Sequence, residues 1–172
     1  VTFLDCDDVW IPDKLEKQIK FYLSGANIVY GAFELIDELG KKIPKNLPKV
    51  KSGQITNNLL IRNMVSIGAI LIDKELITKH KFDPAFNLLG DFDLWVRLSL
   101  LEEFCCVDGV VELSRNHKNN LSKTDWKNWI IEERFFYKQL LKHEGLVKLP
   151  MLIFFIIKCE LKHLIAVILK FL

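Results

Sequence analysis

A chain of 172 residues is long enough to form one domain with a buried core, and a second domain is not expected. Hydrophobic residues make up 50% and charged residues 27% of the chain, which excludes a disordered protein. The formal net charge of +2 gives no basic excess, so we expect no nucleic-acid partner. The four cysteines form no C-x-x-C pair and no zinc spacing, which predicts reduced thiols in a cytoplasmic protein.

The chain opens on an apolar run, residues 1–4, that leads directly into Asp5, Asp7 and Asp8. A short continuous apolar run is typical of a strand buried on both faces of a parallel sheet, and sites form at the carboxyl ends of such strands. Carboxylates crowded there repel one another unless Mg²⁺ or Mn²⁺ binds among them, together with ligand phosphates. The alternative interpretation is a solvated acidic turn that caps the next helix.

No initiator methionine, signal peptide or turn precedes this first apolar run. We therefore expect the chain to be a fragment that lacks the strands and helices flanking residues 1–4. Because such a fragment would leave a sheet edge unpaired, we expect residues 1–172 alone to self-associate and to show no measurable activity.

A helix is predicted to begin at Pro12, because Leu15, Ile19 and Leu23 recur at four-residue spacing and would form its buried face. Gly25 would end this helix in a left-handed conformation. Apolar runs and turn residues predict the next elements: a strand at 26–36, a turn at 37–42, a lysine-rich loop over the site at 41–55, a short helix at 56–63 and a strand at 67–72.

The second half of the chain continues the alternation of helices and strands. Residues 80–90 are irregular, and a helix is predicted to begin at Asp91. Its buried positions would be Leu94, Leu98 and Leu101. The remaining predicted elements are a strand, or a strand pair turning at Asp108, over 105–112, a polar loop at 113–122 and a helix at 123–144. This alternation predicts the α/β class.

Polar residues at loops and helix starts are the other candidates for chemistry. Asp91 lies at a helix start, where it could instead cap amide donors. Asp93 and Arg97 lie four residues apart on one helix face, so a local ion pair explains them. Arg115 and His117 suit contacts to phosphate or metal, although a plain surface loop would also account for them.

Four segments together resemble the family-two glycosyltransferases of the GT-A fold, in particular the bacterial enzymes that build surface polysaccharides. The segments are FLDCDDVWIPDKLEKQI, VSIGAILIDKELI, GDFDLWVRL and SRNHKNNLS. They span residues 1–122 in the family's order. The resemblance implies a GT-A-like mixed sheet flanked by helices, without its first strands, and a helical C-terminal extension at 123–172.

The same resemblance implies roles for four polar residues. Asp5 and Asp7 match the family's Asp-x-Asp, which holds a divalent metal, Mg²⁺ or Mn²⁺, and the diphosphate of a nucleotide sugar. Asp7 is the expected direct metal ligand. Arg115 and His117 match the family's late Arg-x-His segment, so Arg115 is expected at the donor and His117 at the metal.

The family's catalytic base belongs to a Glu-Asp pair at a helix start, which corresponds here to Gly90 and Asp91. Glycine replaces the glutamate, so Asp91 is expected to be the base. The resemblance thus implies a metal-dependent, inverting transfer from a nucleotide-sugar donor to a hydroxyl of a sugar or lipid-linked sugar. The identity of the donor is not readable, because the segments that grip its base and ribose have no counterpart here.

Two alternatives use the same residues. Asp5 and Asp7 after an apolar strand also match the nucleophile motif of haloacid dehalogenase-like phosphatases. However, residues 10–15 continue as the glycosyltransferases do, and the flexible segment expected after the phosphatase motif is absent. The second alternative is a membrane-associated module that keeps the fold in truncated form and does no chemistry.

Residues 149–172 are the most hydrophobic part of the chain. Their longest charge-free stretch, residues 149–157, is too short for a membrane span of ~20 residues. We therefore expect an interfacial helix with lysines at headgroup level, at the inner face of the cell membrane. Packing of this helix against protein is the alternative.

Overall fold

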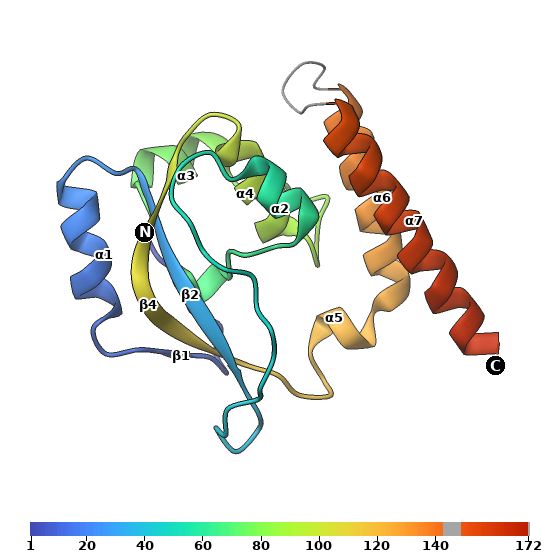
Figure 1. Ribbon diagram of the computed structural model, residues 1–172, viewed down its shortest axis with the longest axis horizontal. Coiled ribbons are helices and arrows are strands. Elements are labelled where there is room, and N and C mark those ends of the chain that lie inside the picture. The colour runs from blue at the N-terminus through green and yellow to red at the C-terminus, as the bar shows by residue number, and fades with distance from the viewer. Residues whose placement is uncertain (143–148, 172) are drawn as a thin grey trace.

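The computed structural model of the chain describes residues 1–142 and 149–171, which form a mixed α/β structure (Figure 1). Four strands make one sheet in the order β1-β4-β2-β3. Their bounds are β1 Val9–Trp10, β2 Ile28–Ile36, β3 Ile70–Ile72 and β4 Phe104–Arg115. The two long central strands, β2 and β4, run parallel, and the outer strands β1 and β3 run antiparallel to their neighbours. The predicted α/β class is confirmed.

The first residues of β2 are buried on both faces, so this part of the strand reads as a continuous apolar run. Ile28, Val29 and Tyr30 have no exposed surface. Gly31 follows them because β4 lies very close: a Cβ atom there would be 2.7 Å from a methyl carbon of Val111. This close approach fixes how β2 packs on β4.

Strand β4 is a single 12-residue strand, so the alternative of a strand pair is wrong. The pairing with β2 steps from Tyr30–Cys106 to Ala32–Val110, which leaves extra residues on β4 at this point. Gly109 lies there with a φ of 85°, a left-handed conformation that suits glycine. The Asp108-Gly109 pair therefore marks a bulge, which bends β4 without reversing it.

The sequence predicted that residues 1–4 form a strand buried on both faces. In the structure this segment is extended, but it is not buried on both faces. Thr2 bridges Leu71 of β3 in antiparallel fashion, and the amino group of Val1 donates to the carbonyl oxygen of Ile72 at 2.7 Å. Val1 and Leu4 keep 48% and 47% of their surface exposed, because no described strand lies beyond them. Since the segment is antiparallel to β3, it runs parallel to β2 and β4 and brings Asp5 to their carboxyl ends.

Helix α1, Lys14–Leu23, packs on the sheet through polar side chains. The predicted buried positions are wrong: Leu15, Ile19 and Leu23 are 37%, 42% and 78% exposed. Lys14 and Gln18 are buried instead, because the Lys14 Nζ donates to the Gln18 Oε1 and the Gln18 Nε2 donates to backbone carbonyl oxygens of the sheet region. The left-handed Gly25 after the helix is confirmed, with a φ of 102°.

Short helices lie between the strands and after the last one. They are α2 Thr56–Ile61, a 3₁₀ turn at Ile67–Ala69, α3 Lys74–His80, α4 Gly90–Ser99 and α5 Leu121–Thr124. Helix α3 has no counterpart among the sequence predictions, although Asp73 caps it by accepting from the amide of Glu75 at 2.7 Å. Helix α4 begins next to Asp91, as predicted, and buries Leu94 and Leu98, while Leu101 beyond its end is 57% exposed.

Helices α6, Trp126–Lys142, and α7, Leu149–Phe171, lie side by side against the α/β part (Figure 1). Aromatic rings of three helices meet at this junction: the ring centres of Phe92 and Phe136 are 5.0 Å apart, and those of Phe136 and Phe155 are 5.7 Å apart. The core therefore continues into the helical pair. The end of the predicted 123–144 helix lies outside the described residues.

Candidate active site

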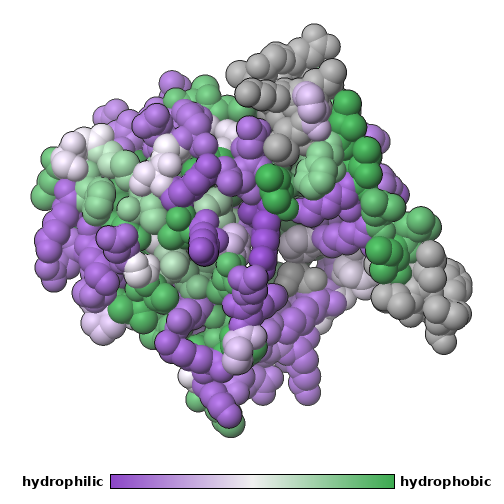
Figure 2. All heavy atoms as spheres, viewed as in Figure 1, coloured by the Kyte–Doolittle hydropathy of each residue, from purple (hydrophilic) through white to green (hydrophobic). Residues whose placement is uncertain are grey.

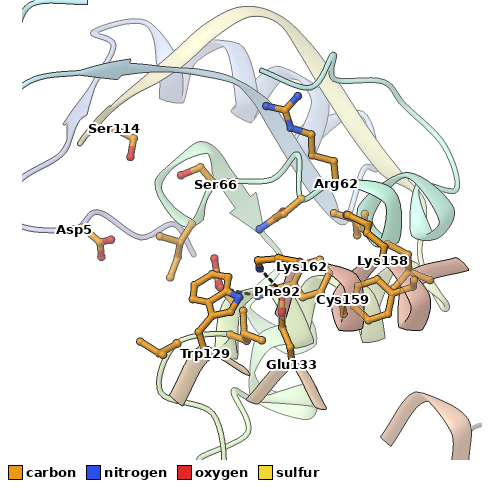
Figure 3. Close-up of a pocket in the computed structure, with 18 of the residues that line it drawn as sticks. Asp5, Arg62, Ser66, Phe92, Ser114, Trp129, Glu133, Lys158, Cys159 and Lys162 are labelled. Carbon is orange, nitrogen blue, oxygen red and sulfur yellow. Dashed lines mark hydrogen bonds and ion pairs between the residues drawn. The ribbon is translucent and has the colours of Figure 1, made fainter. Parts of the chain in front are cut away.

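A cavity of about 440 Å³ opens between the ends of the parallel strands and the α6–α7 pair (Figure 3). Its wall combines residues from the Asp5–Asp8 turn, from α2, from the start of α4, from β4 and from both C-terminal helices. The polar and charged residues of the wall are Asp5, Asp8, Arg62, Asn63, Ser66, Asp91, Ser114, Glu133, Lys158 and Lys162. The structure thus brings Asp5 and Asp91, 86 positions apart in the printed sequence, to one cavity.

Carboxylates form one side of this cavity. Burial, together with the negative charge of Asp5, raises the pKa of Asp91 to about 6. Burial and the charges of Asp8 and Asp7 raise the pKa of Asp5. A carboxyl group with a pKa near 6 in a cavity is well suited to accept a proton at neutral pH.

Another carboxylate binds the amides before helix α4. Glu132 of α6 accepts hydrogen bonds of 2.9 Å from the amides of Asn87, Leu88 and Leu89. The Asp91 Oδ1 accepts from the adjacent Phe92 amide at 2.7 Å. No sequence pattern indicates this role of Glu132, because it depends on how α6 packs. Glu132, rather than Asp91, is therefore the main acceptor for the amides that precede α4. Asp91 lies on the cavity wall.

Asp93 and Arg97 form the ion pair that their spacing predicted, at 2.8 Å. The Arg97 guanidinium also donates to the carbonyl oxygens of His80 and Lys81 at 2.9 Å each. The pair ties the end of α3 to α4, so it stabilises the fold around the site.

Asp7, Arg115 and His117 form a cluster beside the cavity, and none of the three is among its lining residues. The His117 Nε2 lies 2.8 Å from the Asp7 Oδ2. Because the His117 Nδ1 accepts from the Asn119 amide at 3.2 Å, the bonding pattern assigns the proton to Nε2, which donates to Asp7.

Arg115 holds the acidic turn in place. Its Nε donates to the carbonyl oxygen of Asp7 at 2.7 Å, and its Nη1 donates to that of Asp37 at 2.8 Å. Its amide donates to the Asp8 Oδ1 at 2.6 Å. These bonds join the Asp5–Asp8 turn to the carboxyl ends of β2 and β4. The predicted contact of Arg115 with a donor phosphate stays a prediction.

Two residues of this cluster, Asp7 and His117, have side chains of the kind that could hold a divalent cation. Mg²⁺ commonly uses one or two protein carboxylates and completes its shell with water and substrate phosphates. Asp7 offers a carboxylate and His117 an adjacent imidazole, whose Nε2 must lose its proton to become a ligand. Across residues 1–142 and 149–171, no group of three or more His, Cys, Asp or Glu side chains has the geometry of a complete metal site.

Glu112 is a buried acid that the sequence reasoning missed. It has no exposed surface, and a Cβ atom on Gly68 would lie 2.4 Å from its Oε1. Burial, with contributions from Asp8 and Asp5, raises its pKa to about 8. The nearby Lys14 is also buried, and burial lowers its pKa to about 8. Neither residue lines the cavity, and the Lys14 Nζ donates to the Thr2 Oγ1 at 2.8 Å.

Comparisons with known proteins identify relatives of this chain. No family model matches it. It is 32% identical over 108 residues to the UDP-Glc:alpha-D-GlcNAc-diphosphoundecaprenol beta-1,3-glucosyltransferase WfgD of Escherichia coli, which covers 60% of this chain and 38% of that protein. The chain is related to glycosyltransferases.

Two further relatives support this relationship. A putative teichuronic acid biosynthesis glycosyltransferase of Bacillus subtilis is 29% identical over 133 residues, covering 74% of this chain and 50% of that protein. An amylovoran biosynthesis glycosyltransferase of Erwinia amylovora is 26% identical over 153 residues, covering 86% and 57%. The resemblance to glycosyltransferases of surface-polysaccharide pathways is confirmed, and the phosphatase alternative gains no support. The chain spans about half or less of the length of most of the relatives it matches.

Proposed function

We propose that this chain is part of a metal-dependent, inverting glycosyltransferase with a GT-A-like fold that acts in surface-polysaccharide synthesis. Its donor would be a nucleotide sugar and its acceptor a hydroxyl of a sugar or lipid-linked sugar. The observation that carries the proposal is the position of Asp91, whose pKa is about 6, on a cavity wall that also holds Asp5. The relationship to named glycosyltransferases supports the reaction class.

Asp91 is the group proposed to deprotonate the acceptor hydroxyl. With a pKa of about 6, most of its carboxylate is ionised at pH 7, yet it is more basic than an exposed aspartate. A single base that activates the acceptor leads to direct attack on the anomeric carbon, and such an attack inverts its configuration. General base catalysis of this kind contributes about 10²–10⁴-fold to the rate.

Asp7 and His117 are the groups proposed to hold the metal, and Asp5 and Arg115 are proposed to lie at the donor diphosphate. A bound Mg²⁺ or Mn²⁺ would supply charge neutralisation for the leaving diphosphate. Arg115 also fixes the backbone of Asp7 through its 2.7 Å hydrogen bond, so it positions this ligand whether or not it touches the donor.

We also propose a peripheral contact with the inner face of the cell membrane. Among the described residues, no helix combines the length and apolar character needed to cross a membrane. Helix α7 packs on the protein through Phe155, Cys159 and His163, which are at most 4% exposed. Six large apolar residues of α7 are 47–57% exposed: Ile153, Phe154, Ile157, Leu161, Leu164 and Ile165. Figure 2 shows hydrophobic side chains along this helix, as an interfacial helix requires.

The metal-dependent reaction is tested with the full-length gene product. Asp7→Ala should remove Mn²⁺-dependent binding of the nucleotide donor and the transfer of its sugar, because Asp5 and Asp8 line the cavity and the Asp8 Oδ1 already accepts from the Arg115 amide. Asp108→Ala, at an exposed bulge that does not line the cavity, is the matched control and should retain both. Nuclear magnetic resonance of the product gives the anomeric configuration, which should be opposite to that of the donor. Transfer that persists in excess chelator, or retention of configuration, would overturn the corresponding part of the proposal.

A further inference from the structure

The cavity has a second charged side, formed by the helices. Arg62 follows α2, and Lys158 and Lys162 lie one turn apart on α7. Figure 3 shows these side chains on one side of the cavity and the carboxylate of Asp5 on the other. From this arrangement we propose that Arg62, Lys158 and Lys162 bind the phosphate group of a lipid-linked acceptor. This inference rests on the proposed glycosyltransferase function and adds the residues that would bind the phosphate of its acceptor.

The three cations have donors left for a ligand. The Lys158 Nζ donates to the carbonyl oxygen of Ile61, and the Arg62 Nη2 donates to that of Asn46. A lysine ammonium carries three N–H donors and an arginine guanidinium five, so these contacts occupy only part of their capacity. The Lys162 side chain pairs with Glu133 at 2.8 Å but keeps 53% of its surface exposed.

Glu133 does not cancel the positive charge of this side. Burial opposes its ionisation, but hydrogen bonds from Lys162, Trp129 and His163 hold its pKa below the ordinary value. One carboxylate therefore faces three cations, and its second oxygen is occupied by the His163 Nε2 at 2.5 Å. The helical side thus keeps a net positive charge, whereas the opposite side carries Asp5, Asp8 and Asp91.

This separation of charge assigns the two sides to different ligands. An anion that carries no metal is repelled by the three carboxylates and attracted by the cations. Asp91 lies in the same cavity, so a hydroxyl near the proposed base and a phosphate near the cations fit a single acceptor molecule. The ring of Trp129 also lines the cavity, with the Lys162 Nζ 5.2 Å from its centre, and offers an apolar face to the acceptor sugar.

The exposed face of α7 indicates that the phosphate belongs to a lipid. Ile157 and Leu161 immediately precede Lys158 and Lys162 in the chain and are 54% and 55% exposed. With 3.6 residues per turn, the lysines lie on the flank between the buried face of the helix and this apolar face. A phosphate at the lysines would place an attached hydrocarbon chain along the apolar face. WfgD, one of the relatives, is named for an acceptor linked to diphosphoundecaprenol.

The test measures binding to the full-length gene product by titration calorimetry without metal. Geranyl diphosphate is the lipid-linked probe, and inorganic diphosphate is the probe for a free phosphate. We expect the Lys158→Gln/Lys162→Gln variant to weaken geranyl diphosphate binding by at least tenfold, because two charge-assisted contacts are lost. Lys138→Gln, on the exposed side of α6, is the matched control and should bind as the wild type does.

Each outcome bears on the proposal. Unchanged affinity in the double variant overturns it, and equal affinity for the two probes overturns the lipid source of the phosphate. Binding of geranyl diphosphate that is restored in Lys158→Arg/Lys162→Arg supports a role for the positive charge. Circular dichroism checks the fold of every variant. Binding of uridine diphosphate with Mn²⁺ is measured in parallel and should be unaffected by these variants. If the wild type does not bind uridine diphosphate with Mn²⁺, the proposed donor site is contradicted, while the proposal for the cationic site is unaffected.

Discussion

Asp91→Asn should stabilise the fold at neutral pH while it removes the proposed base. Burial raises the pKa of Asp91 from 3.8 to about 6, so the ionised carboxylate is less favourable in the folded protein than in the unfolded chain. One pKa unit corresponds to about 1.4 kcal/mol, so the difference approaches about 3 kcal/mol. The asparagine Oδ1 can still accept from the Phe92 amide, and the variant carries no buried charge.

The sign of the pH dependence follows from the same values. Between pH 3.8 and about 6 the folded protein binds more protons than the unfolded chain, so the contribution of Asp91 to stability falls as pH rises and is constant above about 6. The variant lacks this contribution. The stability difference between variant and wild type should therefore be small near pH 4 and reach its maximum above pH 6.5.

Urea unfolding followed by circular dichroism, at several pH values from 4 to 7.5, measures this difference. Asp108→Asn, at an exposed position, is the control and should show no such trend. If Asp91→Asn is instead less stable than the wild type at pH 7 by about 1 kcal/mol, Asp91 acts as a helix cap and the reasoning is refuted.

Two further predictions concern the C-terminal helices. Glu132→Ala should lower the free energy of unfolding by about 2 kcal/mol or more in urea titrations, because three amides before α4 lose their acceptor, and an unchanged value would contradict this capping role. Ile157→Asp/Leu161→Asp should reduce co-sedimentation with anionic vesicles while leaving Phe155 in the core, and salt should weaken the binding of the wild type. Equal sedimentation of variant and wild type would show that the apolar face of α7 contacts protein.

Much of the fold could be predicted from hydrophobic runs, because burial of apolar side chains decides those elements. The strand at Ile28–Ile36 and the helix beginning beside Asp91 follow this rule. Helix α1 does not follow this rule. Lys14 and Gln18 are buried because they donate hydrogen bonds to carbonyl oxygens, whereas the apolar side chains of the helix stay exposed. A periodic pattern cannot tell which face of a helix meets such carbonyls.

The candidate site was predictable only in part, for a similar reason. Motifs at strand ends and helix starts indicated Asp5 and Asp91, and the topology of the sheet brings both to one cavity. The helical side of that cavity, with Lys158 and Lys162, depends on how α7 packs against α2 and α6. No short-range pattern in the sequence specifies that packing, so this side of the site becomes visible only in the structure.

The pH dependence of sugar transfer by the full-length gene product tests the central claim most directly. The wild-type kcat/KM should rise with pH below about 6, because only the ionised Asp91 accepts the acceptor proton, and should level off above it. Asp91→Asn should lose at least ~10²-fold in kcat with little change in donor affinity, and this rise should disappear. Unchanged turnover in Asp91→Asn, or the same rise in its profile, would contradict the assignment of Asp91 as the base.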